Sequence, residues 1–493
     1  MNAMNVDNLA STEAMTKVLA RLQELEQIVA KDHERRLEDG TFNDGDTAWM
    51  LTSCALVLFM TIPGLALFYS GMARTKNVLS ILMQCFTITG LITFLWLCFG
   101  YSLAFAPVDS NGTAFRLFGD ASRFWLSGIG LDTFHQLAPT IPETVFCIYQ
   151  LTFAIITPAL ITGAFADRMR FNAMLVFMTL WHFVVYCPLA HANWHPSGFL
   201  NKYGALDFAG GNVVHISAGV SGLVCAVYLG HRKGFGKEAF EPHNILLTMV
   251  GASMLWVGWF GFNAGSAGAA TDRAGMALLC TQIATGLATL SWLFTEWLIR
   301  GQPSLQGTVS GAVAGLVAIT PASGYVDQTG AFFIGLIAGP VCYFGAQLKH
   351  HLGYDDALDA FGVHAIGGIL GGILTGFFAT DAVTGRTNGV FYTDTHYGGR
   401  QLGIQLYAIT FAVFWSLVLT LCILFIVDKT IGARVSEAEE EMGLDKSYHG
   451  ESVATTYTQV VKFVDPPGST TEIELTKTNK LVIEGECKGN EAV

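Results

Sequence analysis

The sequence predicts an all-α membrane protein with eleven transmembrane helices. Three observations indicate this fold class. Only 13% of the 493 residues are charged and 52% are hydrophobic, whereas soluble domains usually carry about 25% charged residues. Eleven stretches of at least 21 residues contain no Asp, Glu, Lys or Arg, and about 20 apolar residues suffice to cross a bilayer. The stretches are rich in Gly, Ala and Ser, which favours closely packed helices over the short alternating strands of a β-barrel.

Charged residues separate the eleven expected spans, and some of the breaks are long, such as 109–143. The spans cover residues 47–73, 77–108, 144–166, 171–201, 208–231, 242–271, 274–295, 301–326, 328–348, 360–380 and 401–427.

The distribution of Lys and Arg between the loops predicts the orientation, because these residues are commoner in cytoplasmic loops. With the N-terminus outside, the inner loops hold eleven of them and the outer loops hold six. Lys31, Arg35 and Arg36 in the N-terminal tail add to the outer side, although acidic residues lie among them. We therefore expect a multi-pass protein of the cell membrane with its N-terminus outside and its C-terminus in the cytoplasm.

The two ends of the chain differ from its middle. The first 45 residues contain no apolar core of a signal peptide, so no cleaved signal is expected. The tail from Asp428 onward is charged, and its weakly alternating segment Glu472–Leu475 is compatible with a hairpin or with disorder. Residues 13–36 predict an amphipathic helix, either in a short coiled coil or lying on the membrane or the protein, from apolar residues spaced alternately by three and four: Met15, Val18, Leu22, Leu25 and Val29.

Composition narrows the functional classes. The net charge of −12 argues against a nucleic-acid partner, which requires a clustered basic surface. Nine of the ten cysteines lie in apolar stretches without the spacing of metal ligands, and apolar packing is the usual role of such residues. We expect no metal, no cofactor and no catalytic residue.

Two histidines occupy matching places in the fifth and tenth spans. His215 and His364 are 149 residues and five spans apart, and each is followed by a glycine four residues later, on its own helical face. Because five is odd, a second set of five helices enters the membrane inverted, and inverted repeats bring corresponding residues together near the midplane. The sequence thus predicts an inverted repeat of helices 1–5 and 6–10, with the two histidines meeting at the centre and the eleventh helix outside.

Four strings of residues resemble those of one known family. They are Phe59–Gly64 (FMTIPG), Ala205–Gly211 (ALDFAGG), Gly258–Ser266 (GWFGFNAGS) and Phe361–His364 (FGVH). From about residue 46 to about residue 451, the chain resembles the Amt-type ammonium transporters of the Amt/Rh family, the bacterial branch more than the Rhesus branch. The resemblance implies a homotrimer with one pore per subunit.

The same resemblance divides the chain into four parts. It implies an N-terminal extension (1–45), a transmembrane transporter domain (46–428), a family-type cytoplasmic region (429–451) and a C-terminal extension (452–493).

The resemblance also implies the residues of a pore. The outer recruitment site is expected at Trp194, Ser266 and Tyr149, where the family usually has Phe in place of Tyr149, with the acidic Asp207 nearby. Two stacked phenyl rings, Phe153 and Phe262, are expected to form a gate. Below them a narrow apolar channel would contain the twin histidines His215 and His364, with Trp259 and Thr320 beside it.

These residue types suit ammonium, which carries a positive charge and four N–H donors. Aromatic faces attract cations by about 0.5–2 kcal/mol, and a serine hydroxyl accepts an N–H bond. A dry apolar pore makes bare ions costly, so a cargo that sheds a proton passes whereas potassium does not. Two coupled imidazoles can share and pass a proton. The residues leave open whether ammonia crosses alone or the proton follows it.

Each of these residues also has a structural interpretation. Trp194 suits an interfacial aromatic belt, and Phe153 and Phe262 suit ordinary packing. Asp207 suits an N-cap, and we expect it both to cap the fifth helix and to place negative potential below the recruitment site.

Transport of ammonium or ammonia, with methylammonium as an analogue, is the leading hypothesis. The alternative is an ammonium sensor that signals through the cytoplasmic tail, although no kinase or cyclase domain is attached. A third is a redox enzyme with haem or metal on intramembrane histidines, for which further axial ligands are lacking. The tail motifs Gly432–Val435 and Gly443–Glu451 also resemble the family and permit a PII-type signalling partner at the cytoplasmic face.

Overall fold

The computed structural model describes residues 42–106, 117–393, 395–453, 459–464 and 470–475. The elements in these ranges are helices apart from one pair of strands. The amphipathic helix expected at 13–36 lies outside the described residues.

Ten helical segments of the described chain are long and apolar enough to cross a membrane. They match ten of the eleven stretches predicted from the absence of charge. They are Asp44–Met72 (α2 Asp44–Phe59, η1 Met60–Leu65, α3 Ala66–Met72), Thr75–Phe105 (η2 Thr75–Asn77, α4 Val78–Leu95, η3 Trp96–Gly100, α5 Tyr101–Phe105), Glu143–Phe165 (α6), Phe171–Tyr203 (α7 Phe171–Trp181, η5 His182–Tyr186, α8 Cys187–Trp194, α9 Phe199–Tyr203), Gly211–Leu229 (η6 Gly211–Ile216, α10 Ser217–Leu229), Ile245–Gly265 (α11), Asp272–Arg300 (α12), Gln328–Leu352 (α14), Phe361–Phe378 (η7 Phe361–Ala365, α15 Ile366–Phe378) and Tyr397–Ile431, a part of α17 (Thr395–Ile431).

The remaining expected span, 301–326, is the one that differs. Its helix α13 (Leu305–Ile319) has only 15 residues, and turns follow it. Pro321 explains the early end, because proline has no amide hydrogen to donate to the Val317 carbonyl one turn earlier. Helix α13 contacts α11, α12, α14 and α15. The eleventh apolar helix is therefore present but short, and protein packs around it.

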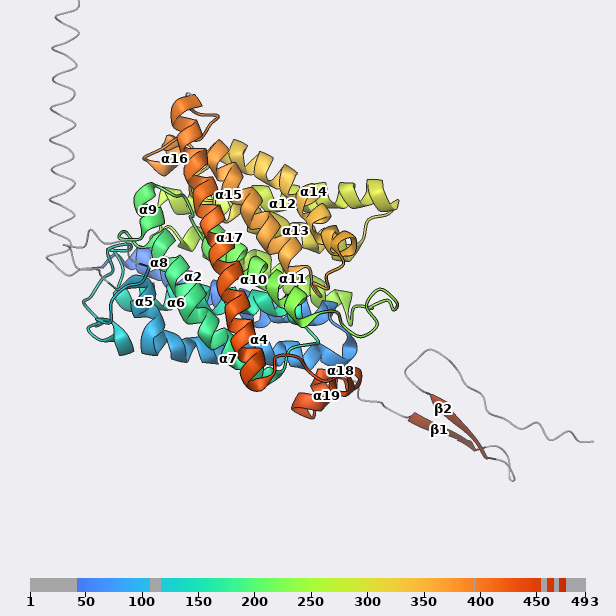
Figure 1. Cartoon of the computed structure of the whole chain (residues 1–493). Coiled ribbons are helices and arrows are strands. Elements are labelled where there is room, and N and C mark those ends of the chain that lie inside the picture. The colour runs from blue at the N-terminus through green and yellow to red at the C-terminus, as the bar shows by residue number, and fades with distance from the viewer. Residues whose placement is uncertain (1–41, 107–116, 394, 454–458, 465–469, 476–493) are drawn as a thin grey trace, which may run out of the picture.

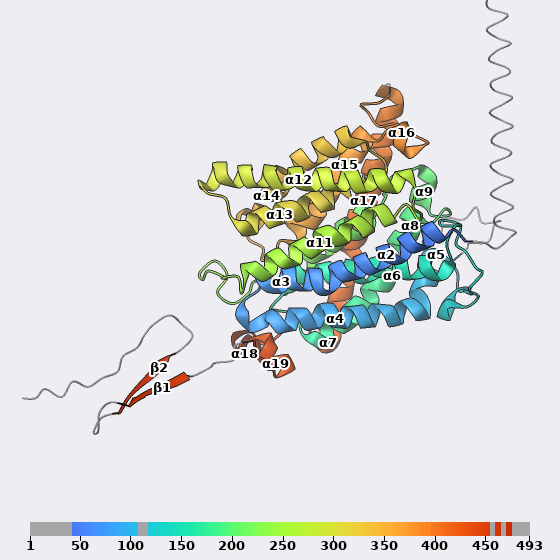
Figure 2. The ribbon, with the colours of Figure 1, turned by 180° about the vertical axis from the view of Figure 1, so that it is seen from behind.

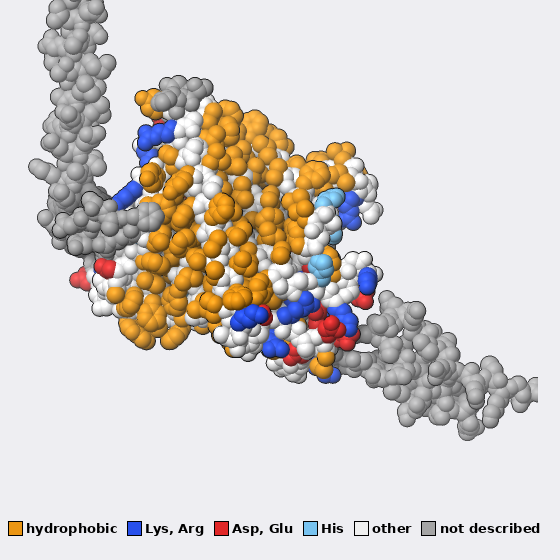
Figure 3. Space-filling view, in the orientation of Figure 1, with side chains coloured by type: hydrophobic (Ala, Val, Ile, Leu, Met, Phe, Trp, Pro, Cys, Tyr) orange, Lys and Arg blue, Asp and Glu red, His pale blue; other side chains and the backbone are white. Residues whose placement is uncertain are grey.

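The outermost long helix, α17, crosses one face of the bundle from α16 (Asp381–Thr384) towards α18 (Glu437–Met442) and α19 (Leu444–His449) (Figure 1). On the opposite face, α4, α2, α11 and α12 run across the view (Figure 2). Hydrophobic side chains cover the face of α17, with Lys and Arg at its upper end and mixed charges along its lower edge (Figure 3). An apolar belt between charged rims is typical of a helix bundle in a bilayer.

Polar residues at the ends of the connections begin several of the helices. Each side chain accepts a hydrogen bond from an amide of the first turn, which otherwise lacks a partner. The capping residues are Asn43 for α2, Asn244 for α11, Thr271 for α12, Ser304 for α13 and Asp327 for α14.

The tail after α17 docks on the start of α4 by exchanging caps with it. The Asp445 carboxylate of α19 accepts hydrogen bonds from the amides of Leu79 (3.0 Å) and Ser80 (2.7 Å). In return, the Asn77 side chain accepts a hydrogen bond from the Leu444 amide at 2.7 Å. The tail therefore completes the first turn of a membrane-spanning helix.

Beyond the docked tail, strands β1 (Gln459–Val464) and β2 (Thr470–Leu475) pair antiparallel, with Gln459 opposite Leu475 and Val464 opposite Thr470. Of the two alternatives for Glu472–Leu475, strand pairing is therefore the one observed. The short elements η4 (Phe124–Leu126) and α16 lie in connections between spans.

Candidate pore and recruitment site

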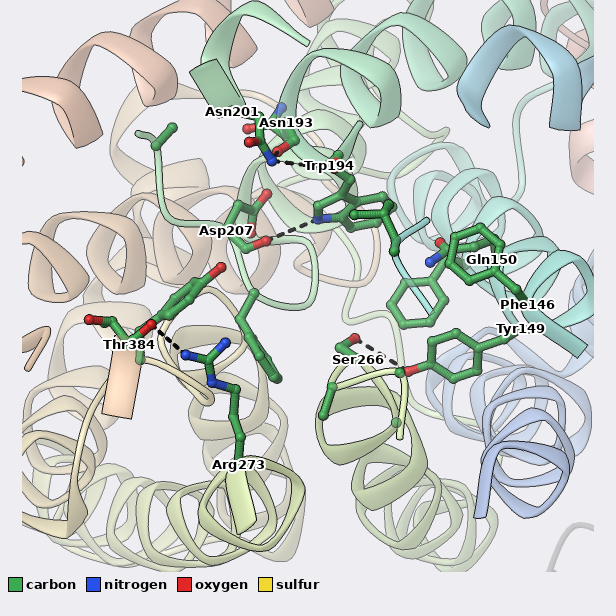
Figure 4. A pocket seen from close by; sticks show the side chains of 18 of the residues that line it. Phe146, Tyr149, Gln150, Asn193, Trp194, Asn201, Asp207, Ser266, Arg273 and Thr384 are labelled. Carbon is green, nitrogen blue, oxygen red and sulfur yellow. Dashed lines mark hydrogen bonds between the residues drawn. The ribbon is translucent and has the colours of Figure 1, made fainter. Parts of the chain in front are cut away.

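A polar and aromatic vestibule of about 320 Å³ opens at one end of the bundle, between α6, α8, the end of α11 and the loop before η6. Its lining includes four residues that sequence analysis placed at a recruitment site, namely Tyr149, Trp194, Asp207 and Ser266. Figure 4 shows Trp194 with Asp207 on one side of this space and Ser266 with Tyr149 on another.

The hydroxyl groups of Tyr149 and Ser266 meet at the end of α11. The Tyr149 hydroxyl lies 3.0 Å from the Gly261 carbonyl, 2.8 Å from the Phe262 carbonyl and 3.3 Å from Ser266 Oγ. Ser266 Oγ also donates to the Phe262 carbonyl at 2.9 Å. Because both hydroxyl hydrogens have carbonyl acceptors nearby, the oxygen lone pairs are available to accept from a bound N–H donor.

Trp194 and Asp207 are joined through the backbone. The Trp194 indole Nε1 donates to the Asp207 main-chain carbonyl at 3.0 Å, so the faces of the ring, rather than its N–H, are available to a ligand. The Asp207 carboxylate accepts from the amides of Gly210 (3.1 Å), Gly211, Asn212 (2.9 Å) and Val213 (3.3 Å). The capping role expected for Asp207 is thus observed, at the start of η6.

Asp207 is only 4% exposed. Burial raises the pKa of its carboxyl to about 6, although its four backbone N–H bonds favour the ionised form and oppose the shift. The group therefore changes charge at mildly acidic pH.

Directly below the vestibule, Phe153 of α6 and Phe262 of α11 stack with ring centroids 4.2 Å apart and planes at 27°. Both rings are buried, and Phe153 also meets the Trp194 ring edge-on at 5.8 Å. The two phenyl rings are thus packed face to face beside the vestibule, whose lining includes Phe153.

The two histidines of the repeated motif do meet. His215 Nδ1 and His364 Nδ1 are 3.4 Å apart, and the rings are nearly parallel. A Cβ on Gly219 would lie 2.3 Å from the Ala365 amide nitrogen, and one on Gly368 would lie 3.1 Å from the His215 Cβ. The glycine four residues after each histidine therefore lets the partner helix approach closely enough for the imidazoles to touch.

Trp259 and Thr320 stand beside this pair. The Trp259 ring lies 5.4 Å from the His215 ring at 16°, and its Nε1 donates to Thr320 Oγ1 at 2.9 Å. Thr320 Oγ1 lies within 2.8 Å of the Leu316 carbonyl and 3.4 Å of Asn263 Oδ1. His215 Nε2 is buried and has no hydrogen-bond partner among the described residues.

Several residues of the vestibule were not foreseen as site residues. Arg273 and Arg386 contribute to its wall, where Arg273 Nη2 donates to the Val383 carbonyl at 2.7 Å. Both arginines are among the six Lys and Arg residues that the sequence analysis counted in the outer loops. Asn193 and Asn201 also line the space, and Asn201 Nδ2 donates to the Trp194 carbonyl at 3.3 Å. No motif distinguishes these side chains from ordinary loop residues.

A metal centre is not indicated. No group of three or more His, Cys, Asp or Glu side chains in the described ranges has the arrangement of a metal site.

The fold and this site define a multi-pass membrane protein in which a series of contacting aromatic and histidine rings adjoins a polar vestibule. Residues 48–454 match the sequence model of the Ammonium Transporter Family. The chain belongs to that family, so it is an ammonium transporter rather than an enzyme.

Individual members of the family are similar to this chain over most of its length. The chain is 46% identical to the ammonium transporter of Bacillus subtilis over 409 residues, which cover 83% of this chain and 98% of the relative. It is also 46% identical to that of Aquifex aeolicus over 414 residues, 84% and 94% of the two chains. The crystal structure of Candida albicans Mep2 matches with a TM-score of 0.75 at 35% identity, covering 82% of this chain and 88% of that one.

Proposed function

We propose that this transporter recruits ammonium at the vestibule, removes its proton at the phenyl gate and passes ammonia along the histidine pair, with the proton following through the imidazoles. The observation that carries the proposal is the 3.4 Å contact between His215 Nδ1 and His364 Nδ1, buried below the Phe153–Phe262 stack. The vestibule, the gate and the histidines form one continuous series of contacting rings from Trp194 to His364.

Recruitment uses two kinds of attraction. The ring faces of Trp194 and Tyr149 favour a cation by about 0.5–2 kcal/mol for a good contact. The Ser266 oxygen, and the Tyr149 oxygen 3.3 Å from it, accept N–H bonds. Potassium has a similar charge and size but no N–H donors, so it gains only the first of these attractions.

The gate and the channel select by dehydration. Phe153 and Phe262 leave no polar partner for a cation between their rings, and a bare charge in an apolar pore is unfavourable by several kcal/mol. Ammonium avoids this penalty by leaving its proton behind, which potassium cannot do.

The histidine pair is suited to carry that proton. A hydrogen bond between two Nδ1 atoms requires one ring to carry hydrogen on Nδ1 and the other to present a lone pair there. The neutral pair is therefore made of two different tautomers. When a proton adds to Nε2 of the ring that carries hydrogen on Nδ1, the shared hydrogen passes to Nδ1 of the partner ring and that ring releases its Nε2 hydrogen, so the two rings exchange tautomers. Such an exchange lets a proton that enters at one ring leave from the other.

The assembly and orientation of the transporter belong to the same proposal. We expect a homotrimer with one pore per subunit, the vestibule and N-terminus outside, and the docked tail in the cytoplasm. Residues 46–428 would form the transporter domain and 429–451 its cytoplasmic region, flanked by the extensions 1–45 and 452–493. We also expect a PII-type signalling protein to be a possible partner at the cytoplasmic face, as the family resemblance of the tail permits. Light scattering of the detergent-purified protein tests the trimer.

A sensing role is the second candidate, because the tail completes the first turn of α4 and can report movements of that helix. A structure titled "Sensor Amt Protein" matches this chain with a TM-score of 0.73 at 26% identity, over 81% of this chain and 97% of that one. Growth of a transporter-deficient cell on low ammonium separates the two roles. Transport predicts rescue by the native chain, whereas a sensor leaves growth unrestored.

A further inference from the structure

Three buried histidines lie behind Trp194, away from the twin histidines of the channel. His135, His191 and His195 are 5%, 0% and 1% exposed. His191 and His195 stack with ring centroids 4.5 Å apart, and His135 meets the His195 ring edge-on at 6.2 Å. Since the described residues include no metal-type cluster, this group needs another explanation.

Two of the three histidines cap the end of helix α5. His191 Nδ1 donates to the Ala104 carbonyl at 3.1 Å, and His135 Nε2 donates to the Phe105 carbonyl at 3.0 Å. A carbonyl only accepts, so each contact fixes the nitrogen that carries hydrogen. These carbonyls belong to the last turn of α5, where intrahelical donors are absent. The capped residue Phe105 is the ring on which Trp194 stacks, with planes at 11° and centroids 6.4 Å apart.

Ser197 joins the other two histidines. Its Oγ lies 2.7 Å from His195 Nδ1 and 3.2 Å from His191 Nε2, and its amide donates to His195 Nδ1 at 3.1 Å. With hydrogen on His191 Nδ1, the neutral ring presents a lone pair at Nε2, so the single serine hydroxyl faces two acceptors. The Ser197 hydroxyl therefore links His191, which precedes Trp194 in the chain, to His195, which follows it.

The loop can make this bridge because Gly198 has no side chain. A Cβ at this position would lie 2.1 Å from the His191 carbonyl and 2.6 Å from the Ala192 carbonyl. The Ser197–Gly198 turn therefore rests directly on the last turn of α8, the turn that ends at Trp194.

We propose that His191, Ser197 and His195 are positioning residues of the recruitment site, which hold the end of α8 so that the Trp194 ring keeps one face on Phe105 and the other side towards the vestibule. This inference rests on the proposed recruitment of ammonium at Trp194.

The histidine and serine side chains act on Trp194 through hydrogen bonds rather than through charge. Burial, with a smaller contribution from Arg123, lowers the pKa of the nearby His135 to about 4 although its bond to the Phe105 carbonyl opposes the shift. Lys202 and Arg123 are the charged groups that face the cluster.

The test compares Ser197→Ala with Ser197→Thr, which keeps the hydroxyl. In proteoliposomes, Ser197→Ala is expected to raise the KM for ammonium three- to tenfold with the maximal rate within twofold of native, because recruitment weakens and the channel is untouched. Ser197→Thr should restore the native KM within twofold. In a Trp194→Leu background, Ser197→Ala should change the KM less than twofold, because its effect acts through Trp194.

Two results would overturn the inference. One is a Ser197→Ala protein with native KM, and the other is a KM increase of the same size with and without Trp194. A second readout does not need transport: the fluorescence difference between proteins with Trp194 and with Trp194→Phe should shift when Ser197→Ala is introduced. An unchanged difference spectrum contradicts the positioning role, whereas a shifted spectrum in a protein that transports no ammonium contradicts only the proposed function.

Discussion

Tyr149 shows what one hydroxyl adds to the proposed aromatic recruitment site. Its ring is buried beside Phe153, and its oxygen lies between the carbonyls of α11 and Ser266. A phenylalanine offers the same ring face without this anchor. Tyr149 therefore adds a second oxygen acceptor beside Ser266 and ties the end of α11 to α6.

Replacing this residue tests the role of the hydroxyl. Tyr149→Phe is expected to raise the KM for ammonium about two- to fivefold, because one neutral hydrogen bond of about 0.5–1.5 kcal/mol is lost while the ring remains. Tyr149→Leu, which removes the ring as well, should raise the KM further. Uptake of labelled methylammonium measures both, and a native KM for Tyr149→Phe would show that the hydroxyl has no part in recruitment.

We expect Asp207 to give the proposed recruitment site a dependence on pH. Its pKa is raised from the ordinary 3.8 to about 6 by burial, so the group is an anion above pH 6 and neutral below it. Loss of the anion removes roughly 1 kcal/mol of attraction for a nearby cation. The KM for ammonium should therefore rise severalfold as the outer pH falls from 7.5 to 5.5.

The matched variants are Asp207→Asn and Asp272→Asn, the latter at an exposed acidic residue at the start of α12. Asp207→Asn should have a high KM that varies little over this range, whereas Asp272→Asn should keep the native pH dependence. The same pH profile in Asp207→Asn as in the native protein would assign the titration to another group.

The sequence predicted which residues lie close together in the candidate site better than it predicted their hydrogen bonds. The twin histidines could be predicted to meet because the same residue and the same glycine spacing occur five spans apart. The bonds of the Tyr149 hydroxyl could not, because they depend on how the end of α11 lies against α6. The His135, His191 and Ser197 contacts join a long loop to two helices, and no sequence spacing marks them.

At the scale of elements, the absence of charge locates membrane helices but does not fix their ends. Span 301–326 is uncharged throughout, yet α13 ends at Ile319 because Pro321 follows. Charge-free length sets an upper limit on a span, and proline, glycine and capping residues then shorten it. The docking of the tail on α4 could not be predicted, since nothing in the order of its residues shows that α19 caps α4.

The cap that Asp445 forms on α4 can be tested by mutation. Asp445→Ala removes the acceptor of the Leu79 and Ser80 amides, which should cost about 1–2 kcal/mol and release α18 and α19 from α4. Limited proteolysis should then cut the tail several times faster than in the native protein. Glu437→Ala, at a side chain that is 87% exposed, is the control and should leave the rate unchanged. Equal rates for Asp445→Ala and native protein would mean that other contacts hold the tail.

At the scale of the whole molecule, the apolar belt between charged rims indicates that the bundle spans a bilayer (Figure 3). The counts of Lys and Arg, eleven against six, predict which end of the bundle faces the cytoplasm. Introduced cysteines test this direction, because Asp381 and Lys237 are exposed in connections at opposite ends of the bundle.

In intact cells, an impermeant maleimide should label Asp381→Cys and should label Lys237→Cys only after the membrane is permeabilised. Among the described native cysteines only Cys422 is exposed, on the apolar helix α17, so the unsubstituted protein serves as the background. The reverse pattern of labelling would place the vestibule on the cytoplasmic side.

In the proposed mechanism a dry channel admits ammonia because ammonium can leave its proton to the imidazoles. This proton transfer is measured as current across a solid-supported membrane carrying the purified protein, with ammonium and then potassium added to the native chain and to the His215→Ala, His364→Ala double variant. We expect a saturable current with ammonium, none with potassium, and loss of the ammonium current in a double variant that elutes as the native protein does. A potassium current in the native protein, or an ammonium current that survives without both histidines, would contradict it.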